Sequence, residues 1–512
     1  MSVGNVDTLS PVWDASAMPA RNPRARPFPN LDWVEVAIAI SFCIYAALFI
    51  FRSSFKIDDI RYFSLFDDDM ISMRYAANLA HGDGLIWNPG GERVLGFTNP
   101  LWVLYMAAFH LLPISAAKVS LCIQISGALF LLLNLLVVRA ISKELMPGSW
   151  SAAVVAMALT AFYGPLNNWS LQGTEVSILT LVVSVSVWLA LLVDKSEAPA
   201  APVYLLLGIS TLIRPDMVIF SGALLLAMAA MHPNQWQRHL ILGGAIVMAF
   251  LIAQVTFDFS YYGEALPNTY YLKMTGFPLL LRIRRGIVVA ILFLIPWIPI
   301  AAAYSLNGVG KWPPRAWLLA AAIAAQLAYS IWVGGDAWEW YGGSNRYVSI
   351  AMPLVFILSA VGIENLAARI AKSIASAPNG LIASLTTTTL AAVFLILVNI
   401  SHSRAILLLA RPIQTDGNED MVRQALLIRQ LTDEHATIAV VWAGAAPYFA
   451  GRQAIDLLGK NDGKVAREPM RFDPSLLTRS FWLLAGTYEV GLRLLDWATQ
   501  TRRGSTAVGE EA

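Results

Sequence analysis

Long apolar runs recur along most of the chain and are separated by short polar segments. Eleven of these runs predict membrane-spanning helices, at residues 33–51, 118–138, 150–163, 176–193, 202–213, 217–231, 239–256, 286–305, 316–333, 348–363 and 381–400. Several are shorter than the ~20 residues that a helix perpendicular to the bilayer needs, so we expect their ends to extend into the flanking loops. A further run at 100–113 has proline at both ends and predicts an interfacial or re-entrant helix.

The charges of the connecting segments predict an orientation. With the N-terminus inside, every inner segment is basic and together they hold Arg21, Arg24, Arg26, Arg139, Lys143, Lys195, Arg238, Lys311, Arg315, Arg369 and Lys372. The other segments carry DDD (67–69), LQGTE (171–175), RPD (214–216), YYGEALPNTYYLK (261–273) and GGDAWEWYGGSNRY (334–347). The positive-inside rule then places the acidic, aromatic and glycine-rich motifs on the outer face of the membrane.

This pattern divides the chain into three regions. Residues 1–32 are polar and proline-rich, which predicts a disordered cytoplasmic tail before an uncleaved first span. Residues 33–400 form the transmembrane region, in which residues 52–117 make a large first outer loop with interfacial helices. Residues 401–512 predict a small α/β domain on the outer face, because TIAVVWAG (437–444) alternates like a strand and residues 475–499 have a helical period.

Composition supports a polytopic membrane protein. Hydrophobic residues make up 57% of the 512 and charged residues only 14%, against roughly 25% in soluble domains. The net charge of +2 says nothing about partners. The sequence shows no basic patch with interleaved aromatic residues, so no nucleic-acid partner is expected. Cys43 and Cys122 lie inside apolar runs, so neither a disulfide framework nor a thiolate metal site is expected.

Three adjacent aspartates, Asp67, Asp68 and Asp69, follow the first span and are the strongest candidates for chemistry. Adjacent carboxylates repel one another, so the pKa of at least one should rise unless a cation lies nearby. The amphipathic segment that follows them would hold them at headgroup height if it lay on the membrane. There they could take a proton from a hydroxyl group or bind a divalent cation such as Mg, Mn or Ca. A solvated, inert acidic loop is the alternative.

Further ionisable residues lie at the predicted mouths of the spans. Glu175 is a candidate site residue, whereas Arg214 and Asp216 could form a structural ion pair. The basic residues Arg74, Lys273 and Arg346 could bind a phosphate, or could instead reach towards lipid headgroups. The tyrosines and tryptophans around them are typical of an interfacial belt and could also form a wall for sugar stacking.

The string FDDDMISMRYAANLAHGDGLIWNPGGERVLGFTNPLW (66–102) resembles the first outer loop of bacterial GT-C fold glycosyltransferases. It is most similar to the group that contains the mycobacterial terminal β-arabinofuranosyltransferase. The segments LQGTE, TLIRPD, YYGEALPNTYYLK, GGDAWEWYGGSNRYVSIAMPL and IDLLGKND extend the resemblance in the same order. Aligned on Arg74-Tyr75-Ala76, the paired aspartates of the family fall on Asp67 and Asp68. Asp69 replaces a usual alanine and Met70 a usual aromatic residue, which leaves the identity of the base open.

The resemblance implies an inverting glycosyltransferase that moves a hexose or pentose from a polyprenyl-phosphate donor. The acceptor would be a hydroxyl of a cell-envelope glycan or glycolipid at the outer face of the bacterial inner membrane. Asp68, then Asp67, then Asp69 are the candidate bases, and Glu175 would orient the acceptor or complete a metal site.

The resemblance also suggests how the donor phosphate and a metal would be held. Arg74, Lys273 and Arg346 would stabilise the phosphate, and Asp67 and Asp69 are candidate ligands of a divalent cation. Such an enzyme needs no nucleotide-binding signature, and the chain has neither a P-loop nor a dinucleotide glycine fingerprint.

Two alternatives stay open. An oligosaccharide ligase or polymerase would use a pyrophosphate-linked glycan, and the sequence separates it from the first interpretation only through the family likeness. A secondary transporter would bury ionisable residues at mid-membrane, in broken helices of two repeated halves. The predicted spans are nearly free of charge and show no matching halves, which disfavours a transporter.

Overall fold

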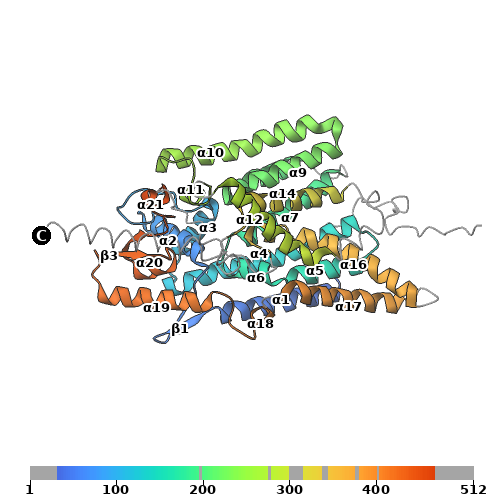
Figure 1. The fold of residues 1–512 in the computed structure, drawn as a ribbon, viewed down its shortest axis with the longest axis horizontal. Coiled ribbons are helices and arrows are strands. Elements are labelled where there is room, and N and C mark those ends of the chain that lie inside the picture. The colour runs from blue at the N-terminus through green and yellow to red at the C-terminus, as the bar shows by residue number, and fades with distance from the viewer. Residues whose placement is uncertain are drawn as a thin grey trace, which may run out of the picture.

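The computed structural model describes residues 31–194, 199–274, 278–298, 315–336, 344–374, 380–400 and 403–467 (Figure 1). Helices dominate these residues, as the apolar runs predict. Several predicted features lie wholly or partly outside them, among them residues 1–30 of the N-terminal tail, the end of the run at 286–305, Lys195 and Lys311, the tryptophan-containing part of the loop at 337–343, and the helix at 475–499.

Each of the eleven apolar runs coincides with a helix of a single bundle. These helices are α1 (Trp33–Arg52), α4 (Ala116–Leu145), α5 (Trp150–Ala161), α7 (Val176–Asp194), α8 (Ala201–Ile213), α9 (Met217–Met231), α10 (Gly244–Tyr262), α12 (Leu279–Leu294), α14 (Ala316–Val333), α16 (Met352–Ile374) and α17 (Gly380–Asn399). Short turns flank two of them: η2 (Pro233–Gln235) and the π-helical η3 (Arg238–Gly243) precede α10, and η4 (Ile295–Trp297) follows α12.

Within the described ranges, seven helices are long and apolar enough to cross a membrane, and three shorter apolar helices (α5, α8 and α9) accompany them. Helices suit a bilayer because each satisfies its own backbone hydrogen bonds. The predicted number of eleven spans stays a prediction.

The helices differ in how much of their surface the bundle covers. The apolar windows of α10 and α17 are each only 17% buried, whereas that of α7 is 61% buried. Figure 1 shows α10 along the edge of the bundle and α7 inside it. The uncovered faces carry large apolar side chains, among them Ile241, Ile252, Phe259, Leu385 and Ile396. Such faces suit contact with lipid tails, which can make no hydrogen bonds to a polar surface.

Ion pairs join helix ends at one end of the bundle. Glu35, at the start of α1, is fully buried and lies 2.7 Å from Arg139 Nε and 3.1 Å from Lys143 Nζ at the end of α4. Asp194, at the end of α7, likewise pairs with Arg315 before α14 at 2.6 Å. These contacts bring together several of the basic residues that the sequence assigns to one face.

A layer of short elements covers the other end of the bundle. It consists of the antiparallel strands β1 (Phe55–Ile57) and β2 (Ile60–Tyr62) and the helices α2 (Asp67–His81), α3 (Pro100–His110), α6 (Gly164–Leu171), α11 (Asn268–Met274) and α15 (Arg346–Ser349). Figure 1 shows α2, α3 and α11 together at its left end. The run at 100–113 does form a separate short helix, the 11-residue α3, which packs against α2.

The C-terminal unit, residues 403–467, lies at the same end. It contains α18 (Ser403–Ile406), α19 (Thr415–Leu431), β3 (Thr437–Val440), α20 (Ala445–Ala450), β4 (Gln453–Asp456) and α21 (Gly463–Arg467). Strands β3 and β4 pair in parallel, with α20 as the connection, so the predicted strand and α/β character are present. Phe449 and Ala450 of this unit share one hydrophobic core with Met70, Tyr75 and Trp87 of the first loop. The two segments therefore pack as one body.

Candidate active site

The three aspartates form the first turn of α2, immediately after Phe66. Negative side chains are favourable here because the N-terminus of a helix carries a partial positive charge. Successive helical residues point about 100° apart. Asp67, Asp68 and Asp69 therefore face three different surroundings, although they are adjacent in the sequence.

Asp67 faces the C-terminal unit. Its Oδ1 accepts a hydrogen bond from the backbone N–H of Ala445 at 2.9 Å, and its Oδ2 accepts one from Gly444 at 3.3 Å. Burial raises the pKa of Asp67 to about 6, although these hydrogen bonds and the charge of Lys460 oppose the shift. The carboxylate of Asp67 thus holds α20 against the start of α2.

Asp68 faces two cations. Its Oδ1 lies 2.5 Å from Lys460 Nζ, and its Oδ2 accepts a hydrogen bond from Arg346 Nη1 at 3.1 Å. Burial alone would raise the pKa of Asp68, but the charges of Lys460 and Arg346 together outweigh it and hold the pKa well below its usual value. Its side chain is 22% exposed, whereas Asp67 and Asp69 are buried. Asp68 is therefore the aspartate of this turn that is both ionised and accessible.

Asp69 is buried within electrostatic range of Glu175. It is 2% exposed, and burial together with the negative charges of Glu175 and Asp68 raises its pKa well above the usual value. Arg346 and Arg214 oppose this shift without cancelling it. The Asp69 carboxyl group consequently binds a proton more tightly than an ordinary aspartate does, because its pKa is raised.

Glu175 belongs to a buried polar network. Its Oε2 accepts a hydrogen bond from Asn99 Nδ2 at 3.1 Å, and its Oε1 accepts one from Arg214 Nη1 at 3.3 Å. Arg214 also bonds both oxygens of Asp216, at 2.9 and 2.6 Å. Arg214 and Asp216 therefore form the expected ion pair, but this pair also connects to Glu175. The contact with Asn99, which precedes α3, was not anticipated from the sequence.

The predicted phosphate ligands Lys273 and Arg346 both lie beside one tyrosine, Tyr347. Lys273 Nζ donates a hydrogen bond to Tyr347 Oη at 2.9 Å. Arg346 Nε lies 2.9 Å from Asp336 Oδ2, so the guanidinium bridges Asp336 and Asp68. The charged groups of Arg214, Lys273 and Arg346 lie 4.9, 5.7 and 5.6 Å from the centre of the Tyr347 ring, within the range of cation–π attraction.

The structure does not support Arg74 as a phosphate ligand. Its guanidinium donates hydrogen bonds to the carbonyl oxygens of Trp87, Pro447 and Arg452 and to Asn88 Oδ1. These acceptors use all three nitrogens of the buried group, which also lies 4.9 Å from the Trp87 ring centre. Arg74 therefore joins the first loop to the C-terminal unit. Sequence proximity to the aspartates gave no sign of these partners, because two of them lie more than 370 positions away.

The side chains do not fit the metal ion expected between Asp67 and Asp69. Both Asp67 oxygens already accept backbone N–H groups, and Asp69 is buried within electrostatic range of Glu175. Across the described segments, no group of three or more His, Cys, Asp or Glu side chains gathers as a metal site would require. The geometry thus provides no basis for a step that passes through a metal.

Lys460 is the site residue that the sequence did not single out. It lies in a turn shaped by the buried Asp456, whose carboxylate accepts the backbone N–H groups of Leu458, Gly459 and Asn461 at 3.0, 3.2 and 2.8 Å. Gly459 has φ of +83°, a conformation that glycine adopts without strain. The sequence feature that could have indicated Lys460 is the segment IDLLGKND, which contains it and is one of the segments that resemble GT-C glycosyltransferases.

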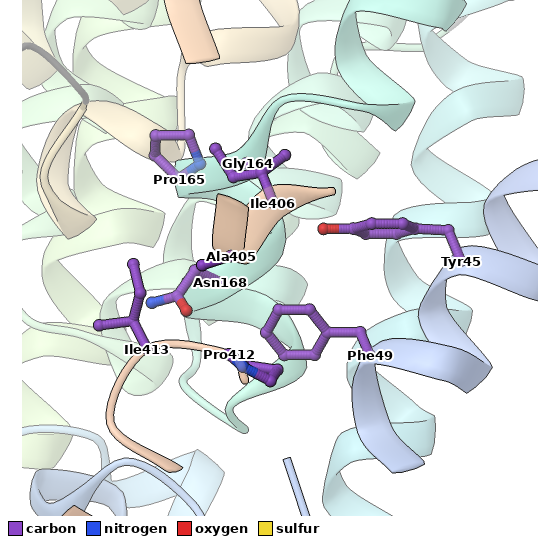
Figure 2. Close-up of a pocket in the computed structure, with 9 residues that line it drawn as sticks. All are labelled: Tyr45, Phe49, Gly164, Pro165, Asn168, Ala405, Ile406, Pro412 and Ile413. Atoms are coloured by element: carbon purple, nitrogen blue, oxygen red, sulfur yellow. The ribbon is translucent and has the colours of Figure 1, made fainter. Parts of the chain in front are cut away.

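A separate apolar pocket lies between α1, α6 and the segment after α18 (Figure 2). Tyr45 and Phe49 of α1 point into it from one side, and Ile406, Pro412 and Ile413 line the other. The lining residues include no charged side chain. This pocket therefore offers no carboxylate, imidazole or amine for acid–base chemistry.

Comparisons with known proteins bear on the fold. Residues 411–501 match a family described as a domain of unknown function (DUF8728). No curated protein matches the chain. The chain is similar to the crystal structure of ArnT from Cupriavidus metallidurans bound to undecaprenyl phosphate, with 13% identity, a TM-score of 0.54, and coverage of 83% of this chain and 85% of that one.

The chain is also similar to the Archaeoglobus fulgidus oligosaccharyltransferase in complex with Zn and sulfate. That match has 12% identity and a TM-score of 0.52, and it covers 83% of this chain but only 62% of that one. Both neighbours are GT-C fold glycosyltransferases. The chain thus has the GT-C fold, which confirms the predicted fold class. The likeness to the arabinofuranosyltransferase group stays a prediction.

Proposed function

We propose that this chain is an inverting glycosyltransferase that moves a sugar from a polyprenyl-phosphate donor to a hydroxyl of a cell-envelope glycan or glycolipid. The observation that carries the proposal is Asp68, an accessible and ionised carboxylate beside Arg346 and Lys460 at one end of a membrane bundle. The GT-C neighbour ArnT, which was solved with undecaprenyl phosphate, supports a donor of this kind.

The proposed chemistry has one step. An acceptor hydroxyl attacks the anomeric carbon while Asp68 takes its proton, and the bond from that carbon to the phosphate oxygen breaks. The polyprenyl phosphate departs with the bonding electrons from the opposite side of the sugar, so the configuration inverts. A positioned general base contributes typically ~10²- to 10⁴-fold to the rate.

Among the three aspartates, Asp68 is the preferred base. Asp67 uses both carboxylate oxygens to accept backbone N–H groups of the C-terminal unit, and Asp69 is buried with a raised pKa. Asp68 also has a cation beside each oxygen, but its side chain is 22% exposed whereas Asp67 and Asp69 are buried, so Asp68 is the carboxylate that an acceptor hydroxyl can reach.

The surrounding residues fit the remaining roles. Arg346 and Lys273 would stabilise the charge that develops on the departing phosphate, because fixed cations act most strongly where water is excluded. Glu175, held by Asn99 and Arg214, would accept hydrogen bonds from the acceptor sugar.

We also propose an orientation for the molecule. The basic residues paired with Glu35 and Asp194 gather at the end of the bundle opposite the aspartates. By the positive-inside rule that end faces the cytoplasm, so the active site and the C-terminal unit lie on the periplasmic face of a bacterial inner membrane.

One rival deserves the same test. An oligosaccharide ligase that uses a pyrophosphate-linked glycan gains some support from the oligosaccharyltransferase among the structural neighbours. It differs in moving a whole glycan rather than one sugar. A transporter receives less support, because the ionisable residues of the site gather beside α2, in the layer that covers the end of the bundle.

The decisive experiment compares surface glycans from cells with and without this protein. Mass spectrometry should show a glycan shorter by one sugar residue in the deletion strain, and the wild-type gene should restore it. Asp68→Asn should be produced at the normal level in the membrane without restoring the glycan. Asp83→Asn, at an exposed aspartate of the same loop, is the matched control and should restore it fully. Restoration by Asp68→Asn would remove the proposed base, and a glycan lacking a whole repeat would favour the ligase.

A further inference from the structure

The C-terminal unit contributes a charged side chain to the site. Lys460 Nζ lies 2.5 Å from Asp68 Oδ1, and the lysine side chain is 24% exposed. The hydrogen bonds of Asp456 hold the backbone of its turn. Asn461, the next residue, accepts a hydrogen bond from Tyr75 Oη at 3.2 Å, which anchors the turn on α2. Lys460 is thus placed against Asp68 by contacts on both of its sides.

This pairing has a chemical consequence for Asp68. A carboxylate compensated by both Lys460 and Arg346 binds a proton weakly, because protonation would break two favourable charge interactions. A general base works best when its pKa lies nearer the operating pH. In the arrangement seen here Asp68 is consequently a poor base, and the reaction requires that its cations be drawn away.

The donor itself carries the group that can do this. Its phosphate oxygens are acceptors for the same ammonium and guanidinium donors that now contact Asp68. Arg346 contacts Asp68 directly, and Arg346 and Lys273 both lie beside Tyr347. A phosphate bound by Arg346 would therefore lie close to Lys460, which contacts the other oxygen of the same carboxylate. Phosphate and carboxylate then compete for the same positive charges.

We propose that Lys460 couples donor binding to activation of the base: it holds Asp68 when the donor is absent and moves to the donor's phosphate when it binds. This inference rests on the proposed function. Released from Lys460, Asp68 accepts the acceptor's proton. The phosphate gains one negative charge as its bond to the sugar breaks, and Lys460 and Arg346 then compensate that charge. The unit matched by a family of unknown function would thereby supply a residue to the reaction.

A binding experiment with farnesyl phosphate as the probe tests the coupling. Affinity is measured by titration calorimetry on purified full-length protein in detergent. Lys460→Met should weaken binding at least about tenfold, because a charge-assisted hydrogen bond to the phosphate is lost. Lys460→Arg should retain most of the affinity. Lys464→Met, at an exposed lysine four positions along the chain, is the matched control and should bind like the wild type.

The second arm uses Asp68→Asn, which changes no phosphate ligand. Removing the competing carboxylate should strengthen farnesyl phosphate binding several-fold in the wild-type background. In the Lys460→Met background the same substitution should have a much smaller effect, because the shared lysine is gone. An equal gain in both backgrounds would indicate general charge repulsion and would overturn the coupling. If Lys460→Met fails to fold, the same comparison is made in the Lys460→Gln background, which removes the charge and keeps a polar side chain.

The two hypotheses fail in different ways. If the wild type binds farnesyl phosphate and Lys460→Met binds it equally well, Lys460 has no role with the phosphate and the proposed function is untouched. If the wild type itself does not bind farnesyl phosphate, the proposed function fails and this inference fails with it. A tenfold loss in Lys460→Met together with an unequal effect of Asp68→Asn supports both.

Discussion

Adding one methyl group at Gly444 should weaken the packing of the C-terminal unit against the first turn of α2. A Cβ added there would lie 1.9 Å from the carbonyl oxygen of Asp67, 2.7 Å from Asp67 Oδ1 and 2.9 Å from the carbonyl carbon of Asp67. Two of these atoms belong to the backbone of α2 and cannot rotate away. Gly444→Ala should therefore move α20 off the first turn of α2.

The expected cost follows from the contacts that this movement breaks. The backbone N–H groups of Gly444 and Ala445 both donate to the Asp67 carboxylate. Hydrogen bonds to a charged group each contribute ~1.5–3 kcal/mol, and overpacking adds a further ~1–3 kcal/mol. Some bonds will re-form with water, so we expect a loss of roughly 3 kcal/mol in the free energy that holds the unit in place.

Hydrogen–deuterium exchange measures this docking directly. In Gly444→Ala, amides of residues 445–467 should exchange about a hundredfold faster, since ~1.4 kcal/mol corresponds to a factor of ten. Transfer activity should fall as well, because Lys460 moves away from Asp68. Gly417→Ala is the matched control within the same unit: its added Cβ meets nothing within 4 Å and lies in helix α19, where alanine is favoured. Wild-type exchange in Gly444→Ala would refute the packing argument.

Two further outcomes test the charges of the site. Arg346→Lys should lower the transfer rate at least about tenfold in a radiolabelled-sugar assay, because a single ammonium cannot bridge Asp336 and Asp68 as the forked guanidinium does. An unchanged rate would show that transfer does not depend on this bridge. Burial raises the pKa of Asp67 to about 6, so the folded state binds a proton at Asp67 more tightly than the unfolded state does. The stability that this proton contributes is therefore lost as the pH rises from about 4 through about 6. Between pH 5.5 and 7.5 the free energy of unfolding, measured by thermal unfolding, should drop by on the order of 1 kcal/mol. Asp67→Asn should lose that part of the pH dependence. An equal pH dependence in both proteins would contradict the raised pKa of Asp67.

The sequence predicts the bundle well because one physical requirement controls it. A segment in a bilayer must be apolar and must satisfy its own backbone hydrogen bonds, so apolar runs coincide with helices such as α1 and α17. Grouping of basic residues was equally predictable, and Arg139 and Lys143 do meet at one helix end. Buried Glu35, which pairs with both, gave no such signal.

The residues of the candidate site could be named from the sequence, but their arrangement could not. The aspartates were identified as a cluster, yet their separate roles depend on the start of α2 at Asp67 and on which segments cover each side. The partners of Arg74 and the position of Lys460 beside Asp68 were not predicted, for the same reason. Their partners lie 373 and 392 positions away in the sequence, and neither periodicity nor local charge carries information over that range.

The position of Lys460 bears on how the molecule is made. Ribosomes deliver the chain from its N-terminus, so α2 emerges long before the turn at Asp456. A nascent polypeptide whose helices have all been inserted still lacks the lysine beside Asp68 and the backbone donors for Asp67. Biosynthesis must therefore reach residue 460 before the candidate site is complete, and products that terminate before it should be inert towards lipid carriers.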